Sequence, residues 1–158
     1  MTRAGLGFDL HPLVAGRPLV LGGVTVPAER GLGGHSDADV LTHAVCEALL
    51  GAMALGDLGR LFPDTDPRYK GVSSLALLRS VMELLAAKGA RLVNVDATVI
   101  CQSPRLGPFL PEMAKQLAAS LGVDPDCVSV KAKSPERLGL LGREEGIAAM
   151  VVASVEAP

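Results

Sequence analysis

The stretch that most constrains the fold runs from His35 to Asp66 and reads HSDADVLTHAVCEALLGAMALGDLGRLFPDTD. Ser36 is a favoured N-cap residue, and Asp39 stands where the acid of a capping box reaches back to the cap. An acidic first turn also suits the positive end of a helix dipole. The residues that follow are mainly apolar, namely Val40, Leu41, Ala44, Val45, Ala48, Leu49 and Ala52. The stretch therefore predicts a largely buried helix that begins beside Ser36.

One stripe of this predicted helix is polar. Asp39, His43 and Glu47 follow each other at intervals of four, so they share one face of the helix. Polar side chains on a buried helix cost free energy unless they have partners. We interpret the stripe as the wall of a functional site.

A partner for this stripe lies upstream, in the segment Gly7–His11. Its residues alternate as in a strand, so Asp9 and His11 should point to the same side. Together with His43 they offer one carboxylate and two imidazoles, a set that suits zinc and leaves one position open for a substrate. The spacing also fits a plainer structure, in which His43 hydrogen-bonds inside the core and His11 closes a strand before Pro12.

Length and composition limit the class of protein. A chain of 158 residues is expected to form one domain over residues 1–158, with about 70% of its unfolded surface buried. Hydrophobic residues make up 49% and aromatic residues only 3%, so the core must be built from Leu, Val, Ala and Ile. A net charge of −2 argues against nucleic acid as the main partner. The apolar excess hints at surface that is buried in an oligomer.

The cysteines and the apolar segments bear on the cellular compartment. Cys46, Cys101 and Cys127 are widely spaced and form no CxxC pair, which favours a reducing environment without a disulfide framework. The first residues lack the apolar run of a signal peptide, and no segment reaches the length that crosses a membrane. We therefore expect a cytoplasmic protein with no membrane partner.

Strand and helix patterns alternate along the chain. Strands are predicted at 2–11, 91–101, 127–132 and 145–155, and a hairpin that turns on Gly22-Gly23 is predicted at 18–26. Two further helices are expected at 73–88 and 108–121. The segments at 31–34 and 57–69 are expected to be loops. Ser73 or Ser74 is expected to cap the second helix, which stops at Lys88-Gly89. The order predicts an α+β fold, with a mixed β-sheet, helices packed on one face and a small hairpin.

The usual motifs of phosphate and acyl chemistry are missing. The chain has no P-loop, no complete dinucleotide fingerprint and no nucleophile elbow, so a covalent nucleophile is unsupported. Near the C-terminus four cations surround the segment Ser134–Glu136: Lys131, Lys133, Arg137 and Arg143. Such a cluster can bind phosphate and a bridging metal ion, or it can be an ordinary charged surface loop.

Several blocks of the sequence closely resemble the 2-C-methyl-D-erythritol 2,4-cyclodiphosphate synthase family, enzymes of the non-mevalonate route to isoprenoids. In order, the blocks are Gly7–His11, Gly22–Val24, His35–Val40, His43-Ala44, Ala54–Asp57, Leu61–Asp66, Asn94–Asp96 and Gly139–Gly146. The HSDxD…HA and LFPDTD blocks together are highly specific, and the similarity covers nearly the whole chain.

The resemblance implies a definite reaction. The 2-phosphate of 4-diphosphocytidyl-2-C-methyl-D-erythritol 2-phosphate attacks the β-phosphorus of its own diphosphate, and CMP leaves. Such an enzyme is a cyclising phosphorus–oxygen lyase. Because the nucleophile belongs to the substrate, the protein has to position it and neutralise charge, which accounts for the missing nucleophile.

The resemblance also assigns residues and partners. Zinc, one ion per subunit, would bind Asp9, His11 and His43, and Glu136 would help to hold a second ion, Mg²⁺ or Mn²⁺. His35 and Ser134 match positions that stabilise the transition state. The substrate pockets would be Ser36, Asp57, Leu58, Gly59, Phe62, Asp64, Thr65 and Asp66 for methylerythritol phosphate, and Cys101, Gln102, Ser103, Pro104, Arg105, Leu106, Gly107, Ala132 and Lys133 for the cytidine diphosphate. The family is a homotrimer with active sites between subunits, and Leu140 and Arg143 match a central cavity that binds an isoprenoid diphosphate in some members.

Some positions depart from the family pattern. Lys133-Ser134-Pro135 replaces a run of threonines, Glu47 replaces an aspartate, Arg105 a lysine and Leu140 an aromatic residue. Ser134 keeps a hydroxyl, whereas Leu140 gives the central cavity an aliphatic side chain in place of an aromatic one. Two other functions also fit the sequence, a metal-dependent phosphoesterase and a non-catalytic trimer that binds an isoprenoid diphosphate.

Overall fold

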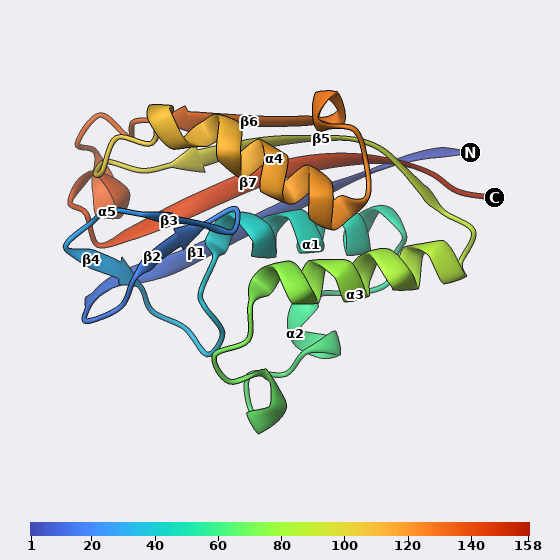
Figure 1. Ribbon diagram of the computed structural model, residues 1–158, viewed down its shortest axis with the longest axis horizontal. Coiled ribbons are helices and arrows are strands. Elements are labelled where there is room, and N and C mark those ends of the chain that lie inside the picture. Colours follow the sequence, from blue (N-terminus) through green and yellow to red (C-terminus); the bar gives the residue numbers. More distant parts are fainter.

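The computed structural model describes all residues from Met1 to Pro158. A five-stranded sheet has the order β4-β1-β7-β5-β6, and β2 and β3 form a separate hairpin (Figure 1). The strands are β1 Thr2–Ala15, β2 Leu19–Leu21, β3 Val24–Val26, β4 Arg30–Leu32, β5 Arg91–Ile100, β6 Val128–Lys133 and β7 Gly146–Glu156. The helices are α1 Val40–Ala52, α2 Leu58–Leu61, α3 Ser74–Ala87, α4 Leu110–Leu121 and α5 Gly139–Gly142.

The sheet is mixed, as the sequence predicts. β5 and β6 are parallel, while β7 runs antiparallel to both β1 and β5. Figure 1 shows α1, α3 and α4 in front of the sheet, and α1 packs directly on β1 and β7. The α+β architecture with helices on one face is therefore confirmed.

Two glycines in β1 allow α1 to lie against the strand backbone. A β-carbon on Gly5 would come 2.0 Å from the carbonyl oxygen of Ala48. The residues of β1 that share this face continue through Asp9 and His11, both partly buried. The alternation predicted from the sequence thus directs both side chains toward the helix layer.

The other face of the sheet is apolar and open. It carries Leu6, Phe8 and Leu10 from β1 and Met150 and Val152 from β7, all exposed. Leu6 pairs with Val152 and Phe8 with Met150, so these side chains form one continuous patch. Exposed apolar patches of this kind mark contact surfaces.

The predicted start of α1 is wrong by one turn, because Asp39 and not Ser36 is the N-cap. The Asp39 carboxylate accepts from the Thr42 N–H at 3.0 Å and also from the backbone N–H groups of Gly22 and Gly23 at 2.9 and 2.8 Å. The hairpin turn therefore covers this side chain completely. Asp39 has no place on the wall of a site, which corrects the interpretation of the polar stripe at that residue.

The other elements follow the predictions, except that β1 continues past residue 11 to Ala15 and that several short elements are added. α3 has Ser73 as its N-cap residue and stops before Gly89, which has φ +69°. The segment expected to be a loop contains α2, the Gly-rich entry contains β4, and α5 was not predicted. All three are short, so they carry little periodicity.

The core is aliphatic, as the low aromatic content predicts. Its largest fully buried side chains are mainly leucines from α1, α3, α4 and the hairpin. None of the three cysteines forms a disulfide. None of the helices is both long enough and apolar enough to cross a membrane.

Candidate active site

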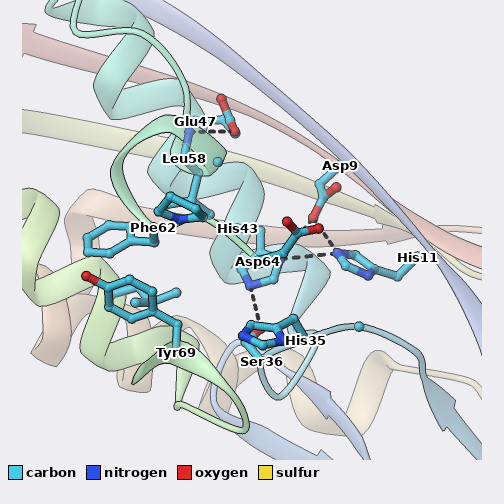
Figure 2. A pocket seen from close by; sticks show the side chains of 14 residues that line it. Asp9, His11, His35, Ser36, His43, Glu47, Leu58, Phe62, Asp64 and Tyr69 are labelled. Carbon is cyan, nitrogen blue, oxygen red and sulfur yellow. Dashed lines mark hydrogen bonds and ion pairs between the residues drawn. The ribbon is translucent and has the colours of Figure 1, made fainter. Parts of the chain in front are cut away.

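Asp9, His11 and His43 meet where β1 passes the first turn of α1. Asp9 Oδ2 lies 2.9 Å from His11 Nε2 and 3.1 Å from His43 Nδ1, and the two ring nitrogens are 3.2 Å apart. The three ligand atoms thus form a small triangle (Figure 2). The structure brings together the three residues that the strand and helix spacing singled out.

The other nitrogen of each ring is turned toward the protein. His11 Nδ1 lies 2.8 Å from the Gly33 carbonyl oxygen, which can only accept, so this nitrogen carries the proton. His43 Nε2 lies 3.1 Å from Ser36 Oγ and 2.8 Å from Ser74 Oγ. When each neutral ring carries its proton on this outer nitrogen, His11 Nε2 and His43 Nδ1 have free lone pairs. The triangle then consists of two such nitrogens and the Asp9 carboxylate.

Three acceptor atoms at this separation need a cation between them. A tetrahedral zinc centre with bonds of about 2.1 Å holds its ligand atoms about 3.4 Å apart, close to the spacing of the triangle. Two imidazoles and one carboxylate suit Zn²⁺ better than Mg²⁺ or Ca²⁺, which prefer oxygen ligands. The residues therefore fit a divalent ion of the zinc class with an open fourth position.

The three groups of the triangle also change each other's pKa values. Burial alone would raise the pKa of Asp9, but the adjoining rings of His11 and His43 outweigh burial and lower that pKa far below its usual range. Burial would lower the pKa of His11, but the hydrogen bond and charge of Asp9 raise it above its usual value. The carboxylate is thus poised to remain charged, as a metal ligand must be.

The triangle forms part of the lining of a cavity of about 480 Å³, whose side chains are drawn in Figure 2. Its lining comprises Asp9, His11, Gly34, His35, Ser36, His43, Glu47, Leu58, Gly59, Phe62, Pro63, Asp64, Tyr69 and Leu77. Phe62 and Tyr69 meet edge to face, with ring centroids 5.2 Å apart. His35 Nε2 donates to the Asp66 carbonyl oxygen at 3.0 Å, which ties the loop after α2 to the start of the α1 segment.

Glu47 closes one end of this cavity. Its Oε1 accepts from the Leu58 N–H at 3.0 Å, so the side chain holds the start of α2 against α1. Burial raises the pKa of Glu47 above its usual value, against the opposing effect of that hydrogen bond. Of the polar stripe, His43 and Glu47 therefore line the cavity.

Most residues assigned to the methylerythritol phosphate pocket line this cavity, but three do not. Asp57 is the N-cap of α2, where its carboxylate accepts from the Arg60 N–H at 2.8 Å. Thr65 is exposed, and the Asp66 carboxylate pairs with Arg68 at 2.7 Å. None of these three residues is part of the cavity lining.

A second cavity, of about 830 Å³, lies between the ends of β5 and β6 and the start of α4. It is lined by Cys101, Gln102, Pro104, Arg105, Leu106, Gly107, Pro108, Leu110, Ala132, Lys133, Ser134 and Glu136. Burial raises the pKa of the Cys101 thiol to about 11, so this cysteine is neutral at pH 7. The assigned cytidine diphosphate residues thus gather at one place, except Ser103, which lines a smaller neighbouring cavity with Pro104.

Within one chain the two cavities are separate. Ser134 and Glu136 line the second, and no lining residue is shared with the first. In Figure 1, α2 lies at the bottom of the view and β6 at the top. Leu140 and Arg143 line neither cavity. Leu140 is exposed, and Arg143 Nε donates to Glu145 at 2.7 Å.

The structure adds residues that the sequence did not single out. Pro63, Tyr69 and Leu77 line the first cavity, and Ser74 reaches His43 from α3. Pro63 is part of the LFPDTD block, which could have indicated it. Tyr69, Ser74 and Leu77 carried no signal, since their contacts depend on how α3 and its preceding loop pack.

Comparison with known proteins places the chain in a family. The YgbB family model matches residues 2–156. The 2-C-methyl-D-erythritol 2,4-cyclodiphosphate synthase of Dechloromonas aromatica is 60% identical over 98% of this chain and 96% of its own length. A solved structure of such a synthase in its CDP-bound form superposes with a TM-score of 0.89 at 37% identity, covering 98% of this chain and 100% of the other. The bifunctional IspDF of Campylobacter jejuni superposes with a TM-score of 0.96 at 39% identity, and the whole chain matches 43% of that longer protein. This chain therefore belongs to the YgbB family.

Proposed function

We propose that this protein is a 2-C-methyl-D-erythritol 2,4-cyclodiphosphate synthase. It converts 4-diphosphocytidyl-2-C-methyl-D-erythritol 2-phosphate into the cyclic diphosphate and CMP, as a phosphorus–oxygen lyase of the non-mevalonate pathway in the cytoplasm. The observation that carries the proposal is the triangle of Asp9, His11 and His43 at the floor of a cavity, in a chain with close relatives of this name.

The first cavity is suited to the methylerythritol phosphate part of the substrate. Ser36, Leu58, Gly59, Phe62 and Asp64 line it together with His35. Asp9, His11 and His43 would hold the Zn²⁺ ion, which would supply Lewis-acid polarisation of the β-phosphate when bound. His35 and the cavity walls hold the 2-phosphate near the diphosphate, which turns the reaction into a well-oriented intramolecular attack.

The second cavity is suited to the cytidine diphosphate part. A relative has been solved in a CDP-bound form, which supports a cytidyl ligand for the site. Lys133 and Arg105 supply positive charge, and the Glu136 carboxylate would help to hold a second ion, Mg²⁺ or Mn²⁺, when one binds with the diphosphate. Ser134 Oγ already accepts from the Glu136 N–H at 3.1 Å, so its own hydrogen is available to a phosphate oxygen.

A complete active site requires two subunits, and we place it between neighbours in a homotrimer. The two cavities lie apart in one chain, while the substrate has to reach both. The open face of the sheet supplies the contact surface, since Leu6 is 63% exposed and Phe8 54% exposed. Leaving such side chains in water is unfavourable by roughly 25 cal/mol per Å² of apolar surface.

The central axis of that trimer is the place for an isoprenoid diphosphate. Leu140 is in α5 and Arg143 is the C-cap residue of that helix, and neither residue lines either cavity. Leu140 offers less surface than an aromatic residue, so this ligand is secondary to the synthase activity.

The deciding experiment is incubation of the protein with the cytidyl substrate, followed by phosphorus NMR. A cyclic diphosphate and CMP in equal amounts are expected. Release of inorganic phosphate would instead indicate a phosphoesterase. Unchanged substrate, in the presence of bound metal, would indicate a binding protein.

A further inference from the structure

We infer that Asp37 and Ser74 are positioning residues for the metal centre, acting on His43 through a chain of hydrogen bonds. The chain runs from the Asp37 carboxylate through the Ser74 hydroxyl to Nε2 of His43. It fixes the ring so that Nδ1 presents its lone pair to Asp9 and His11. The inference rests on the metal centre of the proposed function and extends it to a residue of α3.

The contacts that carry the inference join three separate parts of the chain. Ser74 Oγ lies 2.8 Å from His43 Nε2 and hydrogen-bonds to Asp37 Oδ1. Asp37 Oδ2 accepts from the Ser74 N–H at 3.1 Å, and Oδ1 accepts from the Asp39 N–H at 3.2 Å. Ser74 is completely buried, so water does not replace these bonds.

The direction of the protons follows from what each group can donate. A carboxylate only accepts, so the single hydroxyl proton of Ser74 goes to Asp37. The Ser74 oxygen then has only lone pairs for His43, and Nε2 has to be the protonated ring nitrogen. In a neutral imidazole this leaves Nδ1 unprotonated, as a metal ligand requires.

Ser36 contributes less to this selection. Its hydroxyl oxygen lies 3.1 Å from His43 Nε2 and accepts from the Ala38 N–H at 3.1 Å. No carboxylate contacts the Ser36 hydroxyl, so its proton can turn toward Nε2 as well as away from it. Only Ser74, oriented by Asp37, discriminates between the two tautomers of His43.

The same carboxylate also builds the helix that carries Ser74. The N-cap residue Ser73 makes no side-chain cap hydrogen bond, and the Ser74 N–H is satisfied by Asp37. The Asp37 N–H in turn donates to the Val72 carbonyl oxygen at 3.1 Å. The start of α3 and the ring of His43 are therefore held by one group.

The first test uses the wild-type protein without metal. Nitrogen-15 NMR of the histidine rings at mildly alkaline pH distinguishes a protonated from an unprotonated ring nitrogen. The expected result is that His43 carries its proton on Nε2, with Nδ1 unprotonated, before any zinc is added. A proton on Nδ1, or an even mixture of tautomers, would overturn the inference without any variant.

The second test measures zinc affinity by competition with a chelating dye. Ser74→Ala should weaken zinc binding by about 10- to 100-fold, the usual effect of removing the hydrogen-bond partner of a metal-bound histidine. Ser73→Ala is the matched control, because it removes a hydroxyl from the preceding, exposed residue that makes no side-chain bond. Equal zinc affinity in Ser74→Ala, Ser73→Ala and the wild type would contradict the inference.

Neither readout requires turnover, which separates this inference from the proposed function. A protein that binds zinc with the expected tautomer but leaves the cytidyl substrate unchanged would refute the synthase proposal alone. An active synthase in which Ser74→Ala changes neither the tautomer of His43 nor the zinc affinity would refute the inference alone. Where Ser74→Ala fails to fold, the wild-type spectrum still decides.

Discussion

Gly7 of β1 and Ala44 of α1 are in direct backbone contact, so close that a β-carbon on Gly7 would lie 1.9 Å from the Ala44 carbonyl oxygen. Asp9 follows Gly7 by two residues on the same face of the strand, and His43 precedes Ala44 on the helix. The contact therefore sets the separation between the strand and helix ligands of the metal triangle.

Gly7→Ala is expected to damage both the fold and the metal centre. The added methyl group meets backbone, so α1 has to move away from β1, at a cost of about 1–3 kcal/mol or more. Denaturant unfolding and zinc titration should both show a loss. Gly51→Ala in α1 is the control, since a β-carbon on Gly51 would have no other atom closer than 3.8 Å. It should stabilise the protein by about 0.5–1 kcal/mol.

His43→Ala should abolish the stabilisation of the protein by zinc. In the wild type, zinc at a thousandfold excess over Kd adds about 4 kcal/mol to the free energy of unfolding, and a chelator removes it. The variant keeps only two ligands, so its melting temperature should not respond to zinc or chelator. His35 lines the same cavity but is not one of the three ligands of the triangle. The His35→Ala variant should therefore lose activity, while its melting temperature still responds to zinc and chelator. A zinc response in His43→Ala would reject the ligand assignment.

Asp39→Ala is predicted to destabilise the fold while leaving the metal ligands in place. It removes the acceptor of the backbone N–H groups of Gly22, Gly23 and Thr42 and of the Thr42 hydroxyl, of which only the Gly23 N–H is partly exposed. Each unsatisfied donor costs about 1–3 kcal/mol, so a loss of at least about 3 kcal/mol is expected in urea unfolding. Asp124→Ala, which removes a single exposed cap bond, should cost much less. If Asp39→Ala were as stable as that control, the buried cap would be unimportant.

Two inactive variants should restore each other's activity in a mixed trimer. Asp57 lies beside the first cavity and Lys133 lines the second, so the proposed site takes one from each neighbour. In a random mixture of Asp57→Ala and Lys133→Ala subunits, about a quarter of the sites pair two intact residues. Activity should recover to that extent after subunit exchange. No recovery despite proven exchange would place each site within one chain.

Ser134→Ala should lower kcat more than it changes KM. A hydrogen bond to a charged phosphate oxygen contributes about 1.5–3 kcal/mol, and each 1.4 kcal/mol is about tenfold in rate, so kcat should fall roughly ten- to a hundredfold. Ser134→Thr keeps the hydroxyl and should be nearly neutral. An increase in KM alone would mean that Ser134 only binds substrate.

Periodic features of the chain were predictable from the sequence. The alternation of β1 places Asp9 and His11 on the side of α1, and the four-residue spacing places His43 and Glu47 on one face. The glycine after α3 ends that helix where it was expected. Each of these follows from local geometry, which neighbouring residues alone determine.

Features that depend on distant partners were not predictable. Asp39 rather than Ser36 caps α1, because the turn of the β2–β3 hairpin supplies two further N–H donors. Asp37 caps α3 across 37 residues of sequence, and no local pattern indicates such a bond. The separation of Ser134 and Glu136 from the metal triangle likewise depends on sheet order, which places β6 at an edge.

The long pairing of β1 with β7 has a mechanical consequence. The ladder runs from Thr2 opposite Glu156 to Pro12 opposite Gly146, and both chain ends leave it on the same side (Figure 1). Tension applied between the two chain ends would therefore break the hydrogen bonds between β1 and β7 one after another. It would not load all of them at the same time. Asp9 and His11 belong to the end of the ladder that opens last. A load on the termini would reach the metal ligands only after most of the ladder had separated.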